Sequence, residues 1–317
     1  MTSTRIKVGI SSCLLGNEVR YNGGHKLSTL CTNDLSRYFE FVPTCPEAGA
    51  GLGIPRPPIR LVGDPHAPRA VRVQDAGVDV TDSLKAYSAT RLPELGDLCG
   101  YIFIKNSPSC GLFRVKVYRA NGMPHDEPAR GIFAAEFTRA YPLLPVEEDG
   151  RLQDPVLREN FIARVFAWRN WQEMKANGLS AAALIDFHSR YKYTLMAHSP
   201  QQYQQLGRML ADAGKHDSSV LGERYFSGLM QALQQKATRR TNTNVLMHLQ
   251  GYLKKKLQAG EKQGIGAIIE QYRKGIVPLV VPVTMLRHYF QQHRDPYIEK
   301  QSYLQPYPDE LSLRNAL

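Results

Sequence analysis

Short apolar runs recur along the first half of the chain, and each is followed closely by a cysteine. KVGIS precedes Cys13, EFVP precedes Cys45, and the nearly continuous run YIFIK precedes Cys110. Such runs, bounded by turn-forming residues, are typical of buried strands, and unbroken ones are typical of parallel sheets. Parallel strands end at a common edge, where α/β proteins bind ligands. The pattern therefore predicts that the three cysteines meet at one edge of a sheet.

The segments between these strands carry helical and turn patterns. Helical spacing predicts helices over residues 32–39, 80–92, 91–100 and 131–141. Asn33 or Asp34 is expected to cap the first of these, and the strand EFVP that follows it is expected to end at Pro43. Turn chemistry predicts a proline-rich loop over 53–68, a small hairpin or edge strand at 71–73, a further strand within 113–126, and an extended exit at 142–148.

From about Leu152 the pattern changes to a helical period, with few runs of β-branched residues. The linker EEDGRLQDP, which is acidic and contains both Gly150 and Pro155, is the predicted boundary. The sequence thus predicts two domains. Residues 1–148 form an α/β domain with a mainly parallel sheet, Rossmann or flavodoxin-like, and residues 149–317 form an all-helical domain.

Charge separates the two halves further. The chain has 317 residues and a formal charge of +11, but residues 1–150 contain 17 Lys+Arg against 16 Asp+Glu, whereas the remainder contains 23 against 13. The basic character therefore belongs to the helical half. A polyanion such as RNA is one explanation, because Lys and Arg gain affinity by releasing counterions from phosphates. A basic surface that only keeps the protein soluble is the other.

The chain has no run of about 18 apolar residues and no basic start followed by an apolar stretch and a cleavage site, so a cytoplasmic protein without a membrane anchor is expected. All five cysteines lie in the first 110 residues. A reducing compartment disfavours structural disulfides, which leaves metal binding, nucleophilic chemistry or plain packing.

Three of the cysteines are candidate metal ligands. Cys13, Cys45 and Cys110 form no paired CxxC signature, but each lies among small or polar neighbours that allow a bound group to approach the backbone. Three thiolates would leave one iron of a four-iron cluster open, as a soft site for a sulfur atom. Ordinary buried thiols are the alternative. Cys31 and Cys99 are assigned to packing.

Polar residues beside these cysteines are candidates for catalysis and substrate binding. Glu47 lies two residues after the second cysteine, where it could supply a proton or orient water, or act only as a helix N-terminal charge. Ser107 and Ser109 flank a proline, and their hydroxyls could hold a pyrimidine edge or simply form a turn. Loop residues of the same region are weaker candidates for substrate contacts, with a surface loop as the alternative: Arg20, Tyr21, Asn22 and Arg56.

A basic amphipathic segment in the second half, KATRRTNTNVLMHLQGYLKKKL, is the candidate RNA-binding region. Its cations are Arg239, Arg240, Lys254, Lys255 and Lys256. Together with Tyr252 and the nearby Tyr272, they could hold an RNA backbone and stack on exposed bases. A solvated helix face is the alternative. His188 and His198 do not form an HExxH pair, so no second metal site is predicted.

Four motifs together, SSCLLG, RYNGGHK, CPEAGAGLGIPRPP and KNSPSCG, make residues 5–145 resemble the TudS family of thiouracil desulfidases. The segments FIARVFAWRNW, FHSRYKYTLMAHSP and TRRTNTNVLMHLQGYLKK make the second half resemble the YbgA-type helical domain. The fused arrangement is similar to RudS-type tRNA 4-thiouridine desulfidases.

The resemblance implies a 4Fe-4S cluster held by Cys13, Cys45 and Cys110, with Glu47 assisting attack of water and Ser107 as a substrate or proton-relay residue. The implied reaction is hydrolytic C–S cleavage that converts 4-thiouridine in tRNA to uridine, and no obligate protein partner is implied. Three alternatives stay open. They are desulfurisation of free thiouracil or thiouridine, a metal-free enzyme in which Cys45 or Cys110 attacks the base, and a non-enzymatic nucleic-acid-binding protein stabilised by metal.

Overall fold

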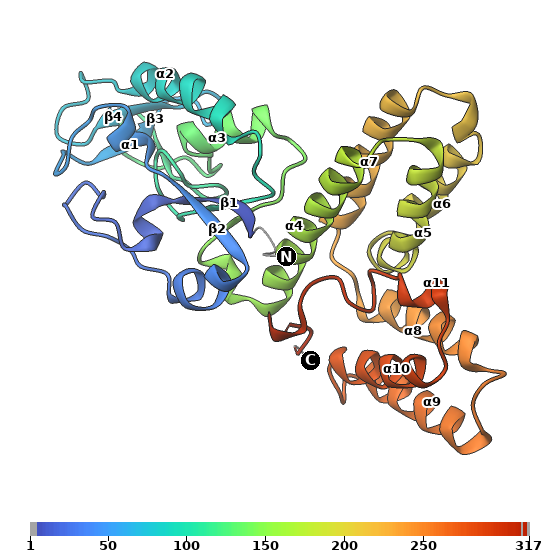
Figure 1. Ribbon diagram of the computed structural model, residues 1–317. Coiled ribbons are helices and arrows are strands. Elements are labelled where there is room, and N and C mark those ends of the chain that lie inside the picture. The colour runs from blue at the N-terminus through green and yellow to red at the C-terminus, as the bar shows by residue number, and fades with distance from the viewer. Residues whose placement is uncertain (1–4, 312, 316–317) are drawn as a thin grey trace. The chain divides into compact units, whose positions relative to one another are not determined.

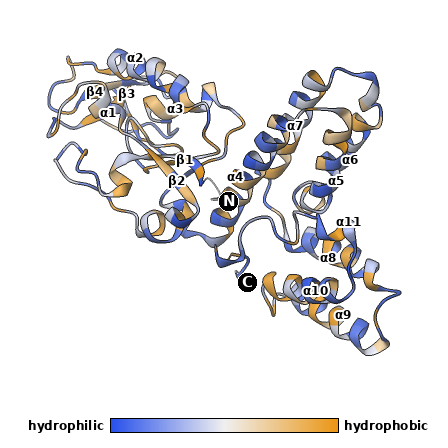
Figure 2. Cartoon of the chain, viewed as in Figure 1, coloured by the Kyte–Doolittle hydropathy of each residue, from blue (hydrophilic) through white to orange (hydrophobic). Residues whose placement is uncertain are grey.

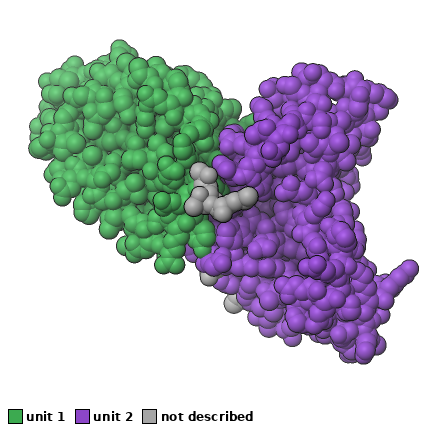
Figure 3. All heavy atoms as spheres, viewed as in Figure 1, with its two compact units in different colours: residues 1–153 green, residues 154–317 purple. Residues whose placement is uncertain are grey.

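The computed structural model describes residues 5–311 and 313–315, in two compact units made of residues 1–153 and 154–317 (Figures 1 and 3). The boundary predicted from sequence, between residues 148 and 149, falls at the end of the last strand of the first unit. In the part of the chain that the structure describes, no helix combines the length and the apolar character needed to cross a membrane.

A four-stranded parallel sheet forms the centre of the first unit, which confirms the predicted fold class. Its strands, in spatial order, are β2 (Phe39–Thr44), β1 (Ile6–Ser11), β5 (Tyr101–Phe103) and β7 (Val146–Glu148). Taken in chain order this is 2-1-3-4, the order with which flavodoxin-like sheets begin. The order reverses between β1 and β5, and such a switch point is where ligands bind in open α/β sheets.

The edge strand β2 corrects one sequence prediction. The strand was expected to end at Pro43, but Pro43 pairs with Ile10 and the strand continues to Thr44. Proline has no backbone N–H to donate. A central strand pairs the N–H groups along both of its edges, whereas an edge strand leaves one row of them unpaired. Its position at the edge therefore allows β2 to continue through Pro43.

Aromatic packing joins the sheet to α3 (Ile132–Ala140). Tyr101 and Phe103 of β5 stack at 4.2 Å between ring centroids, and Phe137 of α3 lies 4.7 Å from the Tyr101 ring. All three rings are buried. In Figure 2, the neighbouring strand β2 is largely apolar, whereas the surrounding helices and loops are mixed in character. The apolar positions of YIFIK thus face a helix, as a continuous apolar strand predicts.

A second, three-stranded sheet takes two strands from the long connection between β2 and β5 and one strand that follows β5. It comprises β4 (Arg69–Arg72), β3 (Ile59–Val62) and β6 (Val117–Tyr118), with β3 and β4 antiparallel and β3 and β6 parallel. The prediction of a loop over 53–68 is therefore wrong for Ile59–Val62. The three preceding prolines made the segment look like a loop, although Leu61 of this strand is completely buried.

Two predicted helices of the first unit are shorter or differently wound. Residues 32–39 contain the end of a π-helical turn, η2 (Leu30–Asp34), followed by the 3-10 turn η3 (Leu35–Arg37). Asp34 stands at the N-cap of η3, but its side chain makes no capping hydrogen bond, and Asn33 lies within η2. The Ser36 hydroxyl donates to the Thr32 carbonyl at 2.6 Å, and such side-chain bonds compete with regular helix. The segment 91–100 forms only the 3-10 turn η4 (Leu92–Leu95), after α2 (Thr81–Arg91).

The second unit is helical throughout its regular structure, as predicted. Its main helices are α4 (Pro155–Ala176), α5 (Ala181–His198), α6 (Pro200–Ala211), α7 (Ser218–Gln234), α8 (Arg239–Leu253), α9 (Ala259–Lys274), α10 (Val280–Gln292) and α11 (Pro296–Glu299). Trp171 of α4 stacks on Phe226 of α7 at 4.7 Å. Leu246 and Leu249 of α8 are fully buried against α9 and α10.

Candidate active site

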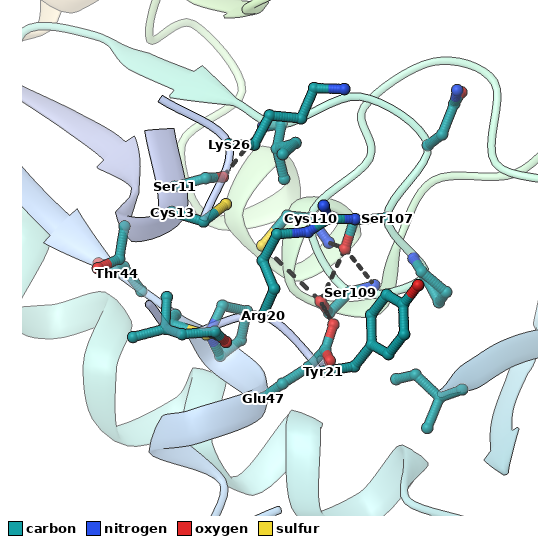
Figure 4. A pocket seen from close by; sticks show the side chains of 18 of the residues that line it. Ser11, Cys13, Arg20, Tyr21, Lys26, Thr44, Glu47, Ser107, Ser109 and Cys110 are labelled. Atoms are coloured by element: carbon teal, nitrogen blue, oxygen red, sulfur yellow. Dashed lines mark hydrogen bonds between the residues drawn. The ribbon is translucent and has the colours of Figure 1, made fainter. Parts of the chain in front are cut away.

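The three candidate cysteines lie just beyond the carboxyl ends of three adjacent strands, as predicted. Cys13 follows β1 in the 3-10 turn η1 (Ser12–Leu15), Cys45 follows β2 and precedes the short α1 (Pro46–Gly49), and Cys110 lies in the loop after β5. All three line one cavity of about 350 Å³ (Figure 4). The cavity opens at the switch point of the sheet, between β1 and β5.

A carboxylate and two hydroxyls form a hydrogen-bonded chain in this cavity. Ser109 Oγ donates to Glu47 Oε1 at 2.6 Å, and Ser107 Oγ lies 3.0 Å from Ser109 Oγ. Ser107 Oγ also accepts the backbone N–H groups of Ser109 at 3.3 Å and Cys110 at 3.1 Å. Residues 62 positions apart in sequence are thus joined beside the cysteines.

The chain of hydroxyls has a direction. Ser109 has one hydroxyl proton, and its 2.6 Å bond to the carboxylate uses that proton. Ser109 Oγ can then only accept from Ser107 across their 3.0 Å contact. Ser109 is buried, whereas Ser107 is half-buried at the cavity wall. Ser107 is therefore the outer hydroxyl of this chain, and Ser109 is the intermediate that connects it to Glu47.

The Arg56 side chain makes its hydrogen bonds within the protein and is not free to contact a substrate. Its guanidinium donates to Glu47 Oε2 at 2.8 Å, to the Gly53 carbonyl at 3.0 Å and to the Val19 carbonyl at 3.0 Å. The Arg56 side chain is only 4% exposed. Arg56 was predicted from sequence to contact the substrate. The structure instead brings it to the second oxygen of Glu47, where it fixes the carboxylate and ties it to the loop containing Val19.

Cationic side chains line the cavity in excess. Arg20, Lys26 and Lys105 join Arg56 there, against the single carboxylate of Glu47. Sequence reasoning did not single out Lys26 or Lys105, although both lie inside the motifs RYNGGHK and KNSPSCG. Such a lining favours negatively charged occupants, including thiolates and a thiolate-bound cluster.

Burial keeps the cysteine thiols protonated. Desolvation, followed by the neighbouring Cys45, raises the pKa of Cys13 to about 11. Desolvation also raises the pKa of Cys45, and desolvation with Cys45 and Glu47 nearby raises that of Cys110 well above its usual range. Deprotonation of all three thiols therefore needs additional positive charge in the cavity, which a bound metal supplies.

The donor set fits an iron-sulfur cluster. Among the described residues, no group of three His, Cys, Asp or Glu side chains is close enough to hold one metal ion. Soft sulfur donors around a cavity with surplus cations fit such a cluster.

The loop that contains Cys110 is held against the start of α3. The backbone N–H groups of Ile132 and Phe133 donate to the carbonyls of Pro108 and Ser109 at 3.0 and 2.9 Å. A Cβ atom at Gly131 would lie 2.5 Å from the Ser109 carbonyl carbon. Close approach at this glycine thus sets the position of the loop.

Not every predicted residue of the first unit joins the site. Tyr21 lines the cavity, but Asn22 is exposed, and its side chain accepts from the Gly24 backbone N–H at 3.2 Å in a local turn. Cys31 and Cys99 are buried outside the cavity lining, consistent with packing. All five cysteines are free thiols.

The predicted RNA-binding cations lie at opposite ends of α8, which spans roughly 22 Å at 1.5 Å per residue. Arg239, at its start, lies over the Tyr272 ring at 5.7 Å, whereas Lys254–Lys256 follow its last residue. Tyr272 is only 5% exposed, so the expectation that it stacks on bases is wrong. Tyr252, which precedes the lysines, is 36% exposed.

Comparisons with known proteins agree with this division. The family described as 2-thiouracil desulfurase matches residues 8–149, and a family described as a protein of unknown function, DUF1722, matches residues 192–308. The uncharacterised protein YbgA of Escherichia coli is 34% identical over 161 residues, which are 50% of this chain and 94% of that protein.

Two further proteins match part of the chain. The uncharacterised protein YbbK of Bacillus subtilis is 34% identical over 108 residues, 32% of this chain and 71% of that protein. A solved structure titled as a 4Fe-4S-dependent thiouracil desulfidase, TudS, is 25% identical, covers 47% of this chain and 95% of its own, and has a TM-score of 0.38. By its sequence match the chain belongs to the YbgA family, and its residues 8–149 match the 2-thiouracil desulfurase family.

Proposed function

We propose that this protein is an iron-sulfur-dependent desulfidase that removes sulfur from 4-thiouridine in tRNA by hydrolysis. One observation carries the proposal. Three cysteines from three strand ends share a cavity with the hydrogen-bonded chain Ser107, Ser109 and Glu47. The cavity, about 350 Å³, is at the small end of ligand pockets and suits a single pyrimidine.

Cys13, Cys45 and Cys110 would hold a 4Fe-4S cluster. When bound, the cluster supplies an open iron as a Lewis acid for the thiocarbonyl sulfur. The cationic side chains of Arg20, Lys26 and Lys105 would offset the negative charge of the three thiolates.

Residues of the chain would orient the water and accept its proton. Overall, a thiocarbonyl and water give a carbonyl and hydrogen sulfide, so no electrons are exchanged. Ser107 orients the water or the pyrimidine edge, and a proton released in the cavity can pass through Ser109 to Glu47 Oε1. Arg56 keeps the carboxylate aimed at this chain.

The thiol environment argues against a metal-free cysteine nucleophile. A nucleophilic cysteine needs a thiolate near neutral pH, but burial raises the pKa of all three cavity thiols, that of Cys13 to about 11. Without a metal, the thiols therefore stay protonated and react slowly.

The basic second unit supports a nucleic-acid substrate. Residues 154–317 contain 22 Lys+Arg against 13 Asp+Glu, whereas the desulfurase unit is nearly balanced. This distribution favours tRNA over the free base as the carrier of the thiolated uracil.

The test is anaerobic reconstitution followed by iron and sulfide analysis and incubation with tRNA that contains 4-thiouridine. We expect cluster-dependent loss of the near-ultraviolet absorbance of the thiolated base. Cys13→Ala, Cys45→Ala and Cys110→Ala should each abolish it, and Glu47→Gln should lower the rate by at least about 100-fold while the cluster stays bound.

The free base serves as the second substrate in the same assay. Turnover of 4-thiouracil without turnover of tRNA would assign the enzyme to the free base. A folded protein that takes up no iron would rule out the cluster. A cluster-loaded protein that is inactive on both substrates would favour a binding protein over an enzyme.

A further inference from the structure

Five side chains from four helices of the second unit form one partly exposed surface. They are His188 and Lys192 of α5, Tyr203 of α6, Tyr252 of α8 and Tyr297 of α11, and we call them the tyrosine surface. Tyr252 and Tyr297 stack with centroids 6.0 Å apart and planes 20° apart, and His188 and Tyr203 are nearly parallel at 5.5 Å. Two stacked ring pairs thus flank one lysine.

Lys192 lies at the centre of this surface. Its ammonium is 5.1 Å from the Tyr193 ring centroid and 5.9 Å from that of Tyr297. Within residues 5–311 and 313–315, Lys192 makes no ion pair with a carboxylate. Its charge is therefore directed at aromatic faces and remains available to an anion.

Phenol groups gather around the same point. Burial, and then a hydrogen bond with Tyr252, raises the pKa of the underlying Tyr193. Burial, with Tyr252 also nearby, raises the pKa of Tyr203 and of Tyr297. The half-buried hydroxyls of Tyr203 and Tyr297 are therefore protonated at neutral pH and can donate hydrogen bonds to phosphate or base oxygens.

Further cations border the surface. Lys254, Lys255 and Lys256 are exposed and follow Tyr252 by two to four residues. Lys256 Nζ donates to the carbonyls of His293 and Arg294 at 3.3 and 3.1 Å, which places the end of α8 beside the start of α11.

The nearby carboxylates already have partners. Glu299 pairs with Arg294 at 3.4 Å, and Asp186 pairs with Lys300 at 3.8 Å. The lysines at the end of α8 and Lys192 thus keep a net positive charge around the stacked rings.

We infer that the tyrosine surface binds single-stranded nucleotides of an RNA, with a base stacked on Tyr252 or Tyr297 and the backbone phosphate held by Lys192 and the lysines after α8. Stacking platforms beside cations are how proteins bind single-stranded nucleic acid without reading sequence. An acidic peptide would use the lysines but not the ring faces. The inference rests on the proposed RNA substrate, and it names where in the helical unit that RNA binds.

The test is fluorescence anisotropy of the full-length protein with labelled single-stranded oligouridine, a blunt RNA duplex and tRNA. Tyr252→Ala and Tyr297→Ala should each weaken oligouridine binding about tenfold. Lys192→Ala should lower the salt dependence of log Kd by about one unit of slope. The matched controls are Tyr289→Ala, a half-buried tyrosine of α10, and Lys262→Ala of α9, neither of which should change affinity.

The outcomes separate this inference from the proposed function. Weaker tRNA binding by the tyrosine variants, with turnover of free 4-thiouracil unchanged, supports both. A wild-type protein that desulfurises tRNA while the tyrosine variants bind and turn over tRNA normally overturns the inference alone. Equal competition by polyglutamate and oligouridine, with no effect of the tyrosine substitutions, would show that the surface recognises charge only and also overturns it. A wild-type protein that binds no RNA contradicts both.

Discussion

At the scale of single residues, Glu47 depends on partners far away in sequence. Ser109 holds one carboxylate oxygen and Arg56 the other, at 2.6 and 2.8 Å. Both partners are buried, so neither contact is weakened by water as a surface pair would be. The orientation of the carboxylate is thus set by the protein before any substrate binds.

Arg56→Ala should therefore lower both activity and stability. We expect kcat to fall by about 100-fold, because the Glu47 carboxylate is no longer held in its orientation. The free energy of unfolding should fall by about 3 kcal/mol. Added guanidine should restore part of kcat, which a purely structural defect would not allow. Arg69→Ala is the control. Arg69 is 61% exposed, so loss of its ion pair with Asp79 should change the free energy of unfolding by under about 1 kcal/mol. Unchanged kcat in Arg56→Ala would remove its positioning role.

Gly131→Ala should disturb the Cys110 loop, although Gly131 itself does not line the cavity. The new methyl group would lie 2.5 Å from the Ser109 carbonyl carbon, so the loop must move, and we expect a loss of about 2 kcal/mol with reduced iron content after reconstitution. Gly260→Ala, where a Cβ meets only open space, is the control and should leave both quantities intact. Chemical denaturation and iron analysis measure the two effects.

His188 should make stability depend on pH. Burial, followed by Lys192, lowers the pKa of His188 to about 4, below its value in an unfolded chain. Between about pH 6.5 and 4 the unfolded state therefore binds more protons, so stability is full above pH 6.5 and declines as the pH falls to about 4. Urea midpoints should fall over this window in the wild type and less steeply in His188→Gln. Parallel pH profiles would contradict this.

At the scale of elements, strand ends and helix starts place the functional groups. The loop that contains Cys110 is joined by backbone bonds to the first N–H groups of α3, which would otherwise lack partners at a helix N-terminus. The second unit instead uses side-chain caps. Asp154 accepts from the backbone N–H groups of Val156 and Leu157 at 2.8 and 3.0 Å, with Pro155 at the first helical position.

Asp154→Ala should destabilise α4 by about 1 kcal/mol, because two N–H groups lose their acceptor. The substitution should lower the urea midpoint without changing turnover of the free base. Asp154→Asn keeps an acceptor oxygen at the cap and should recover most of the loss. Equal stability of the alanine variant and the wild type would show that water replaces the cap.

At the scale of the whole molecule, chemistry and charge are divided between the two units. The cysteine cavity belongs to residues 1–153, whereas most of the excess positive charge belongs to residues 154–317. The two roles can therefore be separated by ionic strength, which weakens contacts with phosphates more than contacts with a neutral base.

Raising the salt concentration should weaken tRNA turnover selectively. Between 50 and 200 mM salt we expect KM for thiolated tRNA to rise by at least about tenfold, with kcat/KM for free 4-thiouracil nearly constant. Parallel measurements on the two substrates provide the control. An equal response of both substrates would place the salt effect in the cavity itself.

The sequence by itself determined the parallel sheet, the helical second half and the position of the three cysteines at strand ends. The spacing of apolar residues and the direction of the chain can be read locally from the sequence. Because parallel strands end at a common edge, the residues that follow them lie at that edge. The strand over Ile59–Val62, the continuation of β2 through Pro43 and the irregular turns over 30–37 were missed, because pairing at a sheet edge or with distant strands overrode local preference.

Only the tertiary structure decided the roles within the site. It joined Ser109 to Glu47, turned Arg56 from a candidate substrate contact into a support for the carboxylate, and buried Tyr272 while leaving Tyr252 exposed. Hydrogen-bond partners and burial depend on where distant segments meet, and no spacing along one chain determines this. The residue types that suit the chemistry were visible in the sequence, but their contacts existed only once the chain had folded.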